Sequence, residues 1–102
     1  MTFRDVWGKH LLVGDGALGT ELEARQRGHT SCLEELNLQE PETVQAVHRD
    51  YLTAGADWIE TNTFGANAAR LRLHGLDDRL SDLVTGGVRL AREVCPAGKF
   101  VA

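Results

Sequence analysis

The sequence lacks the features that mark membrane-spanning and secreted proteins. No apolar run in its 102 residues approaches the roughly 20 residues that a transmembrane helix needs. Its first five residues also lack the charged and then apolar pattern of a secretory signal. We therefore expect a cytoplasmic protein that has no membrane partner.

Cysteines and clustered basic residues are equally scarce. Cys32 and Cys95 belong to no CxxC motif and have no flanking histidine pair, so neither a disulfide framework nor a zinc motif is predicted. The 11 lysines and arginines are scattered and the net charge is -4, which disfavours nucleic acid as a partner. Arg70, Arg72 and Arg79 come nearest to a basic patch, but their spacing is typical of a solvated helix face.

The apolar pattern of the first forty residues predicts one strand, one helix and a loop. Residues 10–13 are predicted to form a short buried strand, with Trp7 packed nearby in the core. Residues 20–27 favour a helix, which Gly28 is expected to end in the left-handed conformation. Residues 29–40 have no clean period, which indicates an ordered loop.

Stronger signals follow in the second half. A helix is predicted to begin at Pro41, because proline is preset for the first helical position. Its apolar stripe, which ends at Gly55, consists of Val44, Val47, His48, Tyr51 and Leu52. The remaining predicted elements are a strand at residues 57–62, a helix at 67–73 ended by Gly75, a longer amphipathic helix at 83–95 closed by Pro96, and a strand at 99–102.

The order strand, helix, strand, helix, strand predicts an α/β fold with parallel strands. The last predicted strand reaches Ala102 with nothing after it to cover its far side. We therefore expect residues 1–102 to be the opening part of a larger α/β domain.

A glycine-rich loop follows the first predicted strand. Gly14, Gly16 and Gly19 fit the G-x-G-x-x-G pattern, so a nucleotide-binding oxidoreductase has to be considered. Asp15 argues against it, because a carboxylate inside the loop would repel a pyrophosphate. The loop also suits an amino acid, whose carboxylate can accept from backbone N–H groups while Asp15 holds its ammonium group. A purely structural interpretation is that Asp15 caps the following turn and the glycines permit positive φ.

Polar side chains also gather where the second strand should end. Residues 60–63 read Glu-Thr-Asn-Thr, although a buried parallel strand is normally apolar. In α/β proteins ligands bind at the carboxyl ends of the strands. Glu60 alone is as well explained as a buried acid satisfied by backbone, but Asp15 at the neighbouring strand end favours a binding site.

Several separated motifs then match one family in the right order. Residues 15–20 (DGALGT), 35–38 (ELNL), 55–57 (GAD) and 60–67 (ETNTFGAN) together closely resemble the homocysteine S-methyltransferase domain. Residues 32–37 look most like the bifunctional proteins that join this domain to a methylenetetrahydrofolate reductase, although cobalamin-dependent methionine synthases begin similarly.

The resemblance implies a TIM (β/α)8 barrel, of which this chain would supply the first two to three β/α units. It implies that a zinc-bound homocysteine thiolate attacks an activated methyl group to give methionine, with cobalamin or methyltetrahydrofolate as candidate methyl sources. The substrate-binding residues that it implies are Asp15, Gly16, Ala17, Glu60, Thr63 and Phe64.

The sequence departs from the family at the metal. The resemblance implies three zinc-binding cysteines on later strands, two of them in a Gly-Gly-Cys-Cys motif, and neither Cys32 nor Cys95 corresponds to them. We therefore expect no activity from this chain alone, whose predicted partners are homocysteine and the remainder of the barrel or another chain that covers the third strand. The alternative is a truncated, non-catalytic ligand-binding or interaction module. A reading frame that continues into a Cys-Cys pair would distinguish the two.

Overall fold

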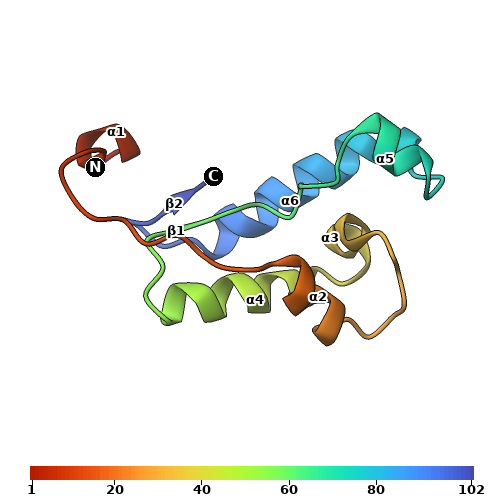
Figure 1. Ribbon diagram of the computed structural model, residues 1–102, viewed down its shortest axis with the longest axis horizontal. Helices are drawn as coiled ribbons and strands as arrows, with labels where there is room; N and C mark the ends of the chain where they lie inside the picture. The colour runs from red at the N-terminus through yellow and green to blue at the C-terminus, as the bar shows by residue number, and fades with distance from the viewer.

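The computed structural model describes all of residues 1–102, and most of its regular structure is helical. The elements are α1 (Phe3–Val6), α2 (Gly19–Arg25), η1 (Leu33–Glu35), α3 (Leu36–Gln39), α4 (Pro41–Thr53), β1 (Trp58–Ile59), α5 (Ala68–Arg72), η2 (Asp77–Arg79), α6 (Leu80–Val94) and β2 (Phe100–Val101). The chain is elongated, measuring 44 × 25 × 19 Å, with α1 and α5 at opposite ends (Figure 1). None of its helices is long and apolar enough to cross a membrane.

The strands are parallel, as the predicted order requires. Trp58 of β1 lies opposite Phe100 of β2, and Ile59 lies opposite Val101. On the other edge of β1, Gly14 forms a single parallel bridge with Trp58. The structure is therefore α/β, with three parallel segments side by side and the third predicted strand in place.

The first predicted strand is an error of the sequence interpretation. Residues 10–13 form no strand, and the side chains of Leu11 and Val13 are 91% and 53% exposed. The segment touches β1 only at its end, where Asp57 N–H donates to the carbonyl of Val13 and Asp15 N–H donates to that of Trp58. The apolar run predicted burial, but no second layer covers this stretch of the chain.

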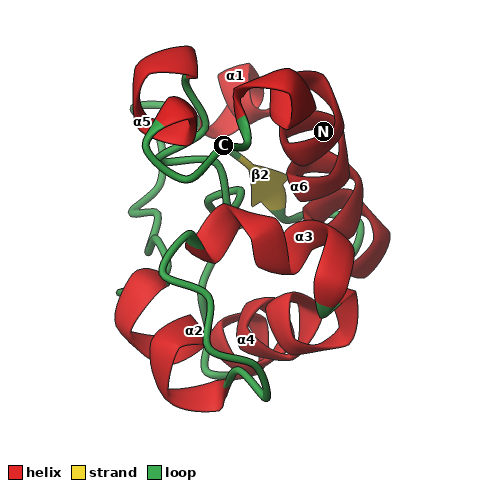
Figure 2. Cartoon of the chain, turned by 90° about the vertical axis from the view of Figure 1, so that its right-hand side faces the viewer, coloured by secondary structure: helices red, strands yellow, loops and turns green.

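The helices pack around an apolar core on one side of the sheet. Leu22, Leu36, Val44, Val47 and Leu90 form the main cluster. Figure 2 shows α3 beside α4 and α6, and these three helices contact one another in pairs. The predicted stripe of α4 is confirmed, because Val44, Val47 and His48 are fully buried. The same face of α4 carries Tyr51 toward the loop that precedes α2.

Glycine ends two helices as predicted but not a third. Gly55 after α4 and Gly75 after α5 have φ values of +114° and +70°. The prediction for Gly28 was wrong, because α2 ends at Arg25 and Gly28 has no positive φ. Instead, the Glu40 carboxylate accepts hydrogen bonds from the Arg27 and Gly28 N–H groups. A long-range contact therefore forms this turn.

Two further predictions differ from the structure. Residues 29–40 are not only a loop, since they contain η1 and α3, which are too short to show a periodic pattern. Trp7 is not a core residue, because it is 69% exposed and packs on Phe3 of α1, with ring centroids 5.2 Å apart. The helical segment α1 itself was not predicted.

Candidate functional site

The two acidic residues at the strand ends lie on adjacent segments. Asp15 Oδ2 accepts a hydrogen bond from Glu60 N–H at 3.0 Å. Asp15 N–H in turn donates to the carbonyl of Trp58 at 3.1 Å. Asp15 is half-buried and Glu60 is exposed. Because a carboxylate offers about four acceptor positions, Asp15 keeps capacity for a second donor, such as an ammonium group.

Backbone donors stand beside this carboxylate. Gly16 and Ala17 are exposed, and their N–H groups donate to no other group of the chain. The loop is held by Tyr51, whose hydroxyl donates to the carbonyl of Ala17 at 2.7 Å. Sequence reasoning treated Tyr51 only as part of the apolar stripe of α4. The signal in the sequence that could have revealed this role is a hydroxyl group on the otherwise apolar stripe of α4, because a half-buried hydroxyl needs a hydrogen-bond partner.

Close packing, not positive φ, explains the first two glycines of the loop. A Cβ atom on Gly14 would overlap the indole of Trp58, and one on Gly16 would lie 3.0 Å from the Tyr51 hydroxyl. None of the three loop glycines has a positive φ. The structural interpretation of the loop was therefore wrong in both parts, because the Asp15 carboxylate accepts from Glu60 N–H and not from an N–H group of the following turn.

The strand-end residues after Glu60 divide into outward and inward side chains. Phe64 is 91% exposed, whereas Asn62 is 4% exposed. The Thr63 hydroxyl lies 2.7 Å from that of Thr61. The structure thus brings Asp15 and Glu60 together directly, while no hydrogen bond links Thr63 or Phe64 to either acid. The polar residues 60–63 therefore do not all face one ligand.

A buried histidine contributes to the electrostatics around Asp15. His48 is fully buried and its ring nitrogens have no hydrogen-bond partner in the chain. Burial lowers the pKa of His48, and the negative charge of Asp15 opposes that shift only partly. A histidine with a lowered pKa favours its neutral form, so His48 does not neutralise the negative charge of Asp15.

Asp57 fixes the segment that carries Asp15. Its Oδ2 accepts from Val13 N–H at 2.8 Å, and its Oδ1 lies 3.3 Å from Lys99 Nζ. The hydrogen bond from Val13, helped by the Lys99 ammonium group, holds the pKa of Asp57 below its usual value. One carboxylate therefore connects all three parallel segments at the end opposite the candidate site.

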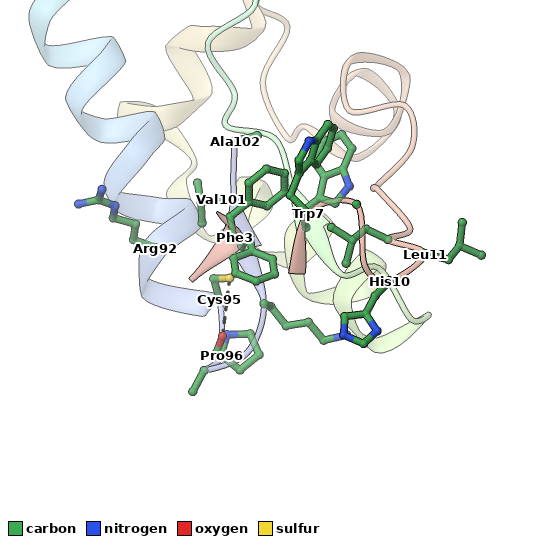
Figure 3. Close-up of a pocket in the computed structure, with 15 residues that line it drawn as sticks. Phe3, Trp7, His10, Leu11, Arg92, Cys95, Pro96, Val101 and Ala102 are labelled. Atoms are coloured by element: carbon green, nitrogen blue, oxygen red, sulfur yellow. Dashed lines mark hydrogen bonds between the residues drawn. The ribbon is translucent and has the colours of Figure 1, made fainter. Parts of the chain in front are cut away.

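A large cavity lies away from the candidate residues. It has a volume of about 1130 Å³ and lies between the N-terminal segment, the end of α6 and β2. Figure 3 shows Trp7, His10 and Leu11 on one side of it and Arg92, Cys95 and Pro96 on the other. None of the six predicted substrate-binding residues lines this cavity, so it is not the predicted site.

The cysteines do not provide a metal site. No group of three or more His, Cys, Asp or Glu side chains lies close enough to hold a metal ion. Cys32 is buried against Leu71 and Leu83, and Cys95 is half-buried just after α6. Burial raises the pKa of both thiols, which disfavours the thiolate that zinc binds. The residues of this chain therefore do not fit a zinc ion.

Fold and site together define an α/β protein with acidic and backbone polar groups at the carboxyl ends of parallel segments. The family model described as homocysteine S-methyltransferase matches residues 12–102. The chain belongs to this family, which confirms the resemblance found in its motifs.

Similar proteins agree with this assignment. The chain is 43% identical over 96 residues to the methionine synthase of Mycobacterium tuberculosis, covering 88% of the chain and 8% of that protein. It is 37% identical over 86 residues to the homocysteine S-methyltransferase of Escherichia coli, covering 81% of the chain and 28% of that protein.

A solved structure gives the same result. The oxidized form of the homocysteine methyltransferase MmuM from Escherichia coli superposes with a TM-score of 0.77 at 33% identity, covering 97% of this chain and 38% of that one. Its metallated form gives a TM-score of 0.73 at 34% identity, covering 89% and 33%. The chain thus spans a minor part of the length of each relative.

Proposed function

We propose that this chain forms the amino-acid-binding part of a homocysteine S-methyltransferase, an enzyme that transfers a methyl group to the thiolate of homocysteine and yields methionine. The observation that carries the proposal is the hydrogen bond from Glu60 N–H to Asp15, beside the free N–H groups of Gly16 and Ala17. Family membership supplies homocysteine as the ligand.

The two ends of the amino acid meet complementary groups. The Asp15 carboxylate receives the ammonium group of homocysteine, and Glu60 adds a second negative charge nearby. The N–H groups of Gly16 and Ala17 donate to its carboxylate. Thr63 and Phe64 line the mouth of the same site, where the exposed ring of Phe64 offers an apolar surface to the substrate chain.

The thiol end has no counterpart among these residues. In the complete domain zinc would bind the sulfur of homocysteine and favour its thiolate form, but no ligand set for zinc lies in this chain. The methyl source, with cobalamin and methyltetrahydrofolate as candidates, also contacts other parts of the protein. In this proposal, residues 1–102 are the first two to three β/α units of a TIM barrel, and the remaining barrel or another chain covers β2. The protein acts in the cytoplasm.

Ligand titrations on the 102-residue chain test whether these residues bind the amino-acid end of homocysteine and not its thiol end. L-homocysteine and L-2-aminobutyrate, which lacks only the thiol, should shift the amide resonances of residues 15–17 and 60 with similar affinity. Propanethiol, which lacks the amino-acid end, should shift none of them. Binding of propanethiol alone would refute the assignment of this site to the amino-acid end.

A matched variant tests the role of Asp15. Asp15→Asn keeps an oxygen that can accept from Glu60 N–H but loses the charge that attracts ammonium. We expect an unchanged thermal midpoint and a dissociation constant for homocysteine at least about tenfold higher, which corresponds to roughly 1.4 kcal/mol. Equal affinity of the variant would remove Asp15 from the site.

Two other functions are decided by the same measurements. An oxidoreductase fragment built on Gly14, Gly16 and Gly19 predicts that NAD(P), rather than homocysteine, shifts the loop resonances. A non-catalytic interaction module predicts no small-molecule response and a partner at β2, whose outer edge is unpaired in this chain.

A further inference from the structure

Two buried asparagines are hydrogen-bonded to each other, and one of them lies in residues 61–64, the segment that follows β1 and Glu60. Asn37 of α3 is 1% exposed and Asn62 is 4% exposed. Asn62 Nδ2 donates to Asn37 Oδ1 at 3.0 Å, and Asn37 Nδ2 donates to the backbone carbonyl of Asn62 at 2.8 Å. Asn62, which belongs to the polar run at the predicted strand end, therefore points into the protein.

The pair also connects elements that are distant in the sequence. Asn37 Nδ2 makes its second hydrogen bond to the carbonyl of Leu83 in α6, at 3.0 Å. Asn62 Nδ2 makes its second to the carbonyl of Leu33 in η1, also at 3.0 Å. Each amide NH2 group has two donor positions, so all four are used. An apolar substitution would leave buried carbonyl groups without donors, which is costly.

Helix α6 approaches this pair through a glycine. A Cβ atom on Gly87 would lie 2.9 Å from Asn37 Nδ2 and 2.9 Å from Thr63 Cγ2. It would also lie 3.2 Å from the carbonyl oxygen of Asn62. Gly87 therefore allows the helix to press directly on the amide pair and on Thr63. No larger residue fits there without moving one of them.

This packing determines where the candidate ligand residues lie. Asn62 directly precedes Thr63 and Phe64, which lie outside the regular strand. One backbone bond joins the segment to the residue after β2, from Thr61 N–H to the carbonyl of Ala102 at 2.9 Å. Before Phe64, the segment is attached through the amide pair and Gly87, and after Phe64 the Gly65 N–H donates to Glu34 Oε2 at 3.2 Å.

We propose that Asn37 and Asn62 are positioning residues of the amino-acid site, which fix Thr63 and Phe64 relative to Glu60 without touching the ligand. This inference rests on the proposed function, because it gives the pair a role in homocysteine binding. A pair that only stabilised the fold would affect every part of the chain equally. A positioning pair affects residues 61–66 more than α2, to which neither asparagine is hydrogen-bonded.

Hydrogen exchange separates these roles in Asn37→Leu, which removes both donors at similar volume. The reporters are the N–H groups of Thr63 and Ala66, and Leu22 N–H in α2 is the reference. We expect the protection of the two reporters to fall at least about tenfold more than that of Leu22. An equal fall at all three sites would overturn the positioning role.

Ligand affinity gives the second readout. The dissociation constant of the folded Asn37→Leu chain for L-homocysteine should rise at least about fivefold, whereas a value within twofold of the unsubstituted chain would also overturn the inference. The control is Asn67→Ala, which removes the cap that accepts from Arg70 N–H and should leave homocysteine affinity unchanged. If Asn37→Leu does not fold, Gly87→Ala displaces the same groups and is measured in the same way.

The two proposals fail differently. An unsubstituted chain that does not bind homocysteine refutes the proposed function. The exchange ratio between residues 63–66 and Leu22 still decides whether the amide pair positions the segment.

Discussion

The Glu40 carboxylate accepts the Gly28 N–H at 2.9 Å, which joins the start of α4 to the turn after α2. It also accepts from Arg27 N–H and from the Thr43 hydroxyl. With its side chain 10% exposed, Glu40 is an internal anchor of the helical layer, although it is a charged residue.

We predict that the stabilising contribution of Glu40 is lost at acidic pH. The hydrogen bonds from the Arg27 and Gly28 N–H groups hold the pKa of Glu40 below its usual value. A carboxyl group with a lowered folded pKa stabilises the protein above its unfolded pKa of about 4.3, and this contribution is lost as the pH falls through the folded pKa. Glu40→Gln should lower the thermal midpoint by several degrees at pH 7.

The difference between Glu40→Gln and the unsubstituted chain should shrink when melting is followed by circular dichroism from pH 7 down to pH 3. Glu42→Gln, at an exposed position two residues later, is the control. A constant difference across this range would contradict the prediction.

His48 should produce a second pH dependence at milder acidity. Burial lowers the pKa of His48, so the unfolded chain binds a proton more readily than the folded chain. Stability therefore falls as the pH drops below the unfolded pKa of about 6.5. His48→Gln should flatten the curve of unfolding free energy between pH 6.5 and 5, measured by urea titration. His29→Gln, at an exposed position, should keep the slope, and an unchanged slope in His48→Gln would disprove the prediction.

Substitution of Gly14 should disturb both the fold and the site. A Cβ atom there overlaps the Trp58 indole, so Gly14→Ala should destabilise the chain by about 1–3 kcal/mol, the usual range for overpacking. Homocysteine affinity should fall as well, because Asp15 is the next residue. Gly19→Ala is the control, since its nearest neighbour lies at an ordinary 3.6 Å. Equal stability of the two variants would show that the indole moves freely.

Zinc should not bind stoichiometrically to the 102-residue chain. The raised thiol pKa values of Cys32 and Cys95 disfavour it, as does the absence of any group of three nearby His, Cys, Asp or Glu side chains. After equilibration with equimolar zinc and gel filtration, elemental analysis should find well below one ion per chain. The Cys32→Ser/Cys95→Ser double variant should give the same value. One tightly held ion per chain would contradict the account of the metal given above.

Local signals explain which parts of the fold were predictable. Pro41 and Gly55 bracket α4 because each restricts or permits a backbone angle by itself, whatever packs nearby. The turn at Gly28 depends on the carboxylate of Glu40, twelve residues away, so no local pattern reports it. In the same way, the apolar run at residues 10–13 predicted a buried strand that the surrounding chain does not cover.

The site was predictable in its residue types but not in the direction of its side chains. The polar run at residues 60–63 indicated a binding site at the strand end, yet Asn62 turns inward to Asn37. An amide can satisfy its hydrogen bonds with a ligand or with the protein, and the sequence does not distinguish these. Geometry alone separates them here.

The pairing of Gly14 with Trp58 sets the register of the site by steric exclusion. In a parallel ladder, a slip by one residue would place the indole against Val13 or Asp15, each of which carries a Cβ atom where Gly14 has none. Among alignments that differ by a single residue, the observed one therefore avoids this overlap. It is also the alignment that brings the carboxylate of Asp15 to the N–H of Glu60, so the absence of a Cβ atom at Gly14 favours the meeting of these two residues at the mouth of the site.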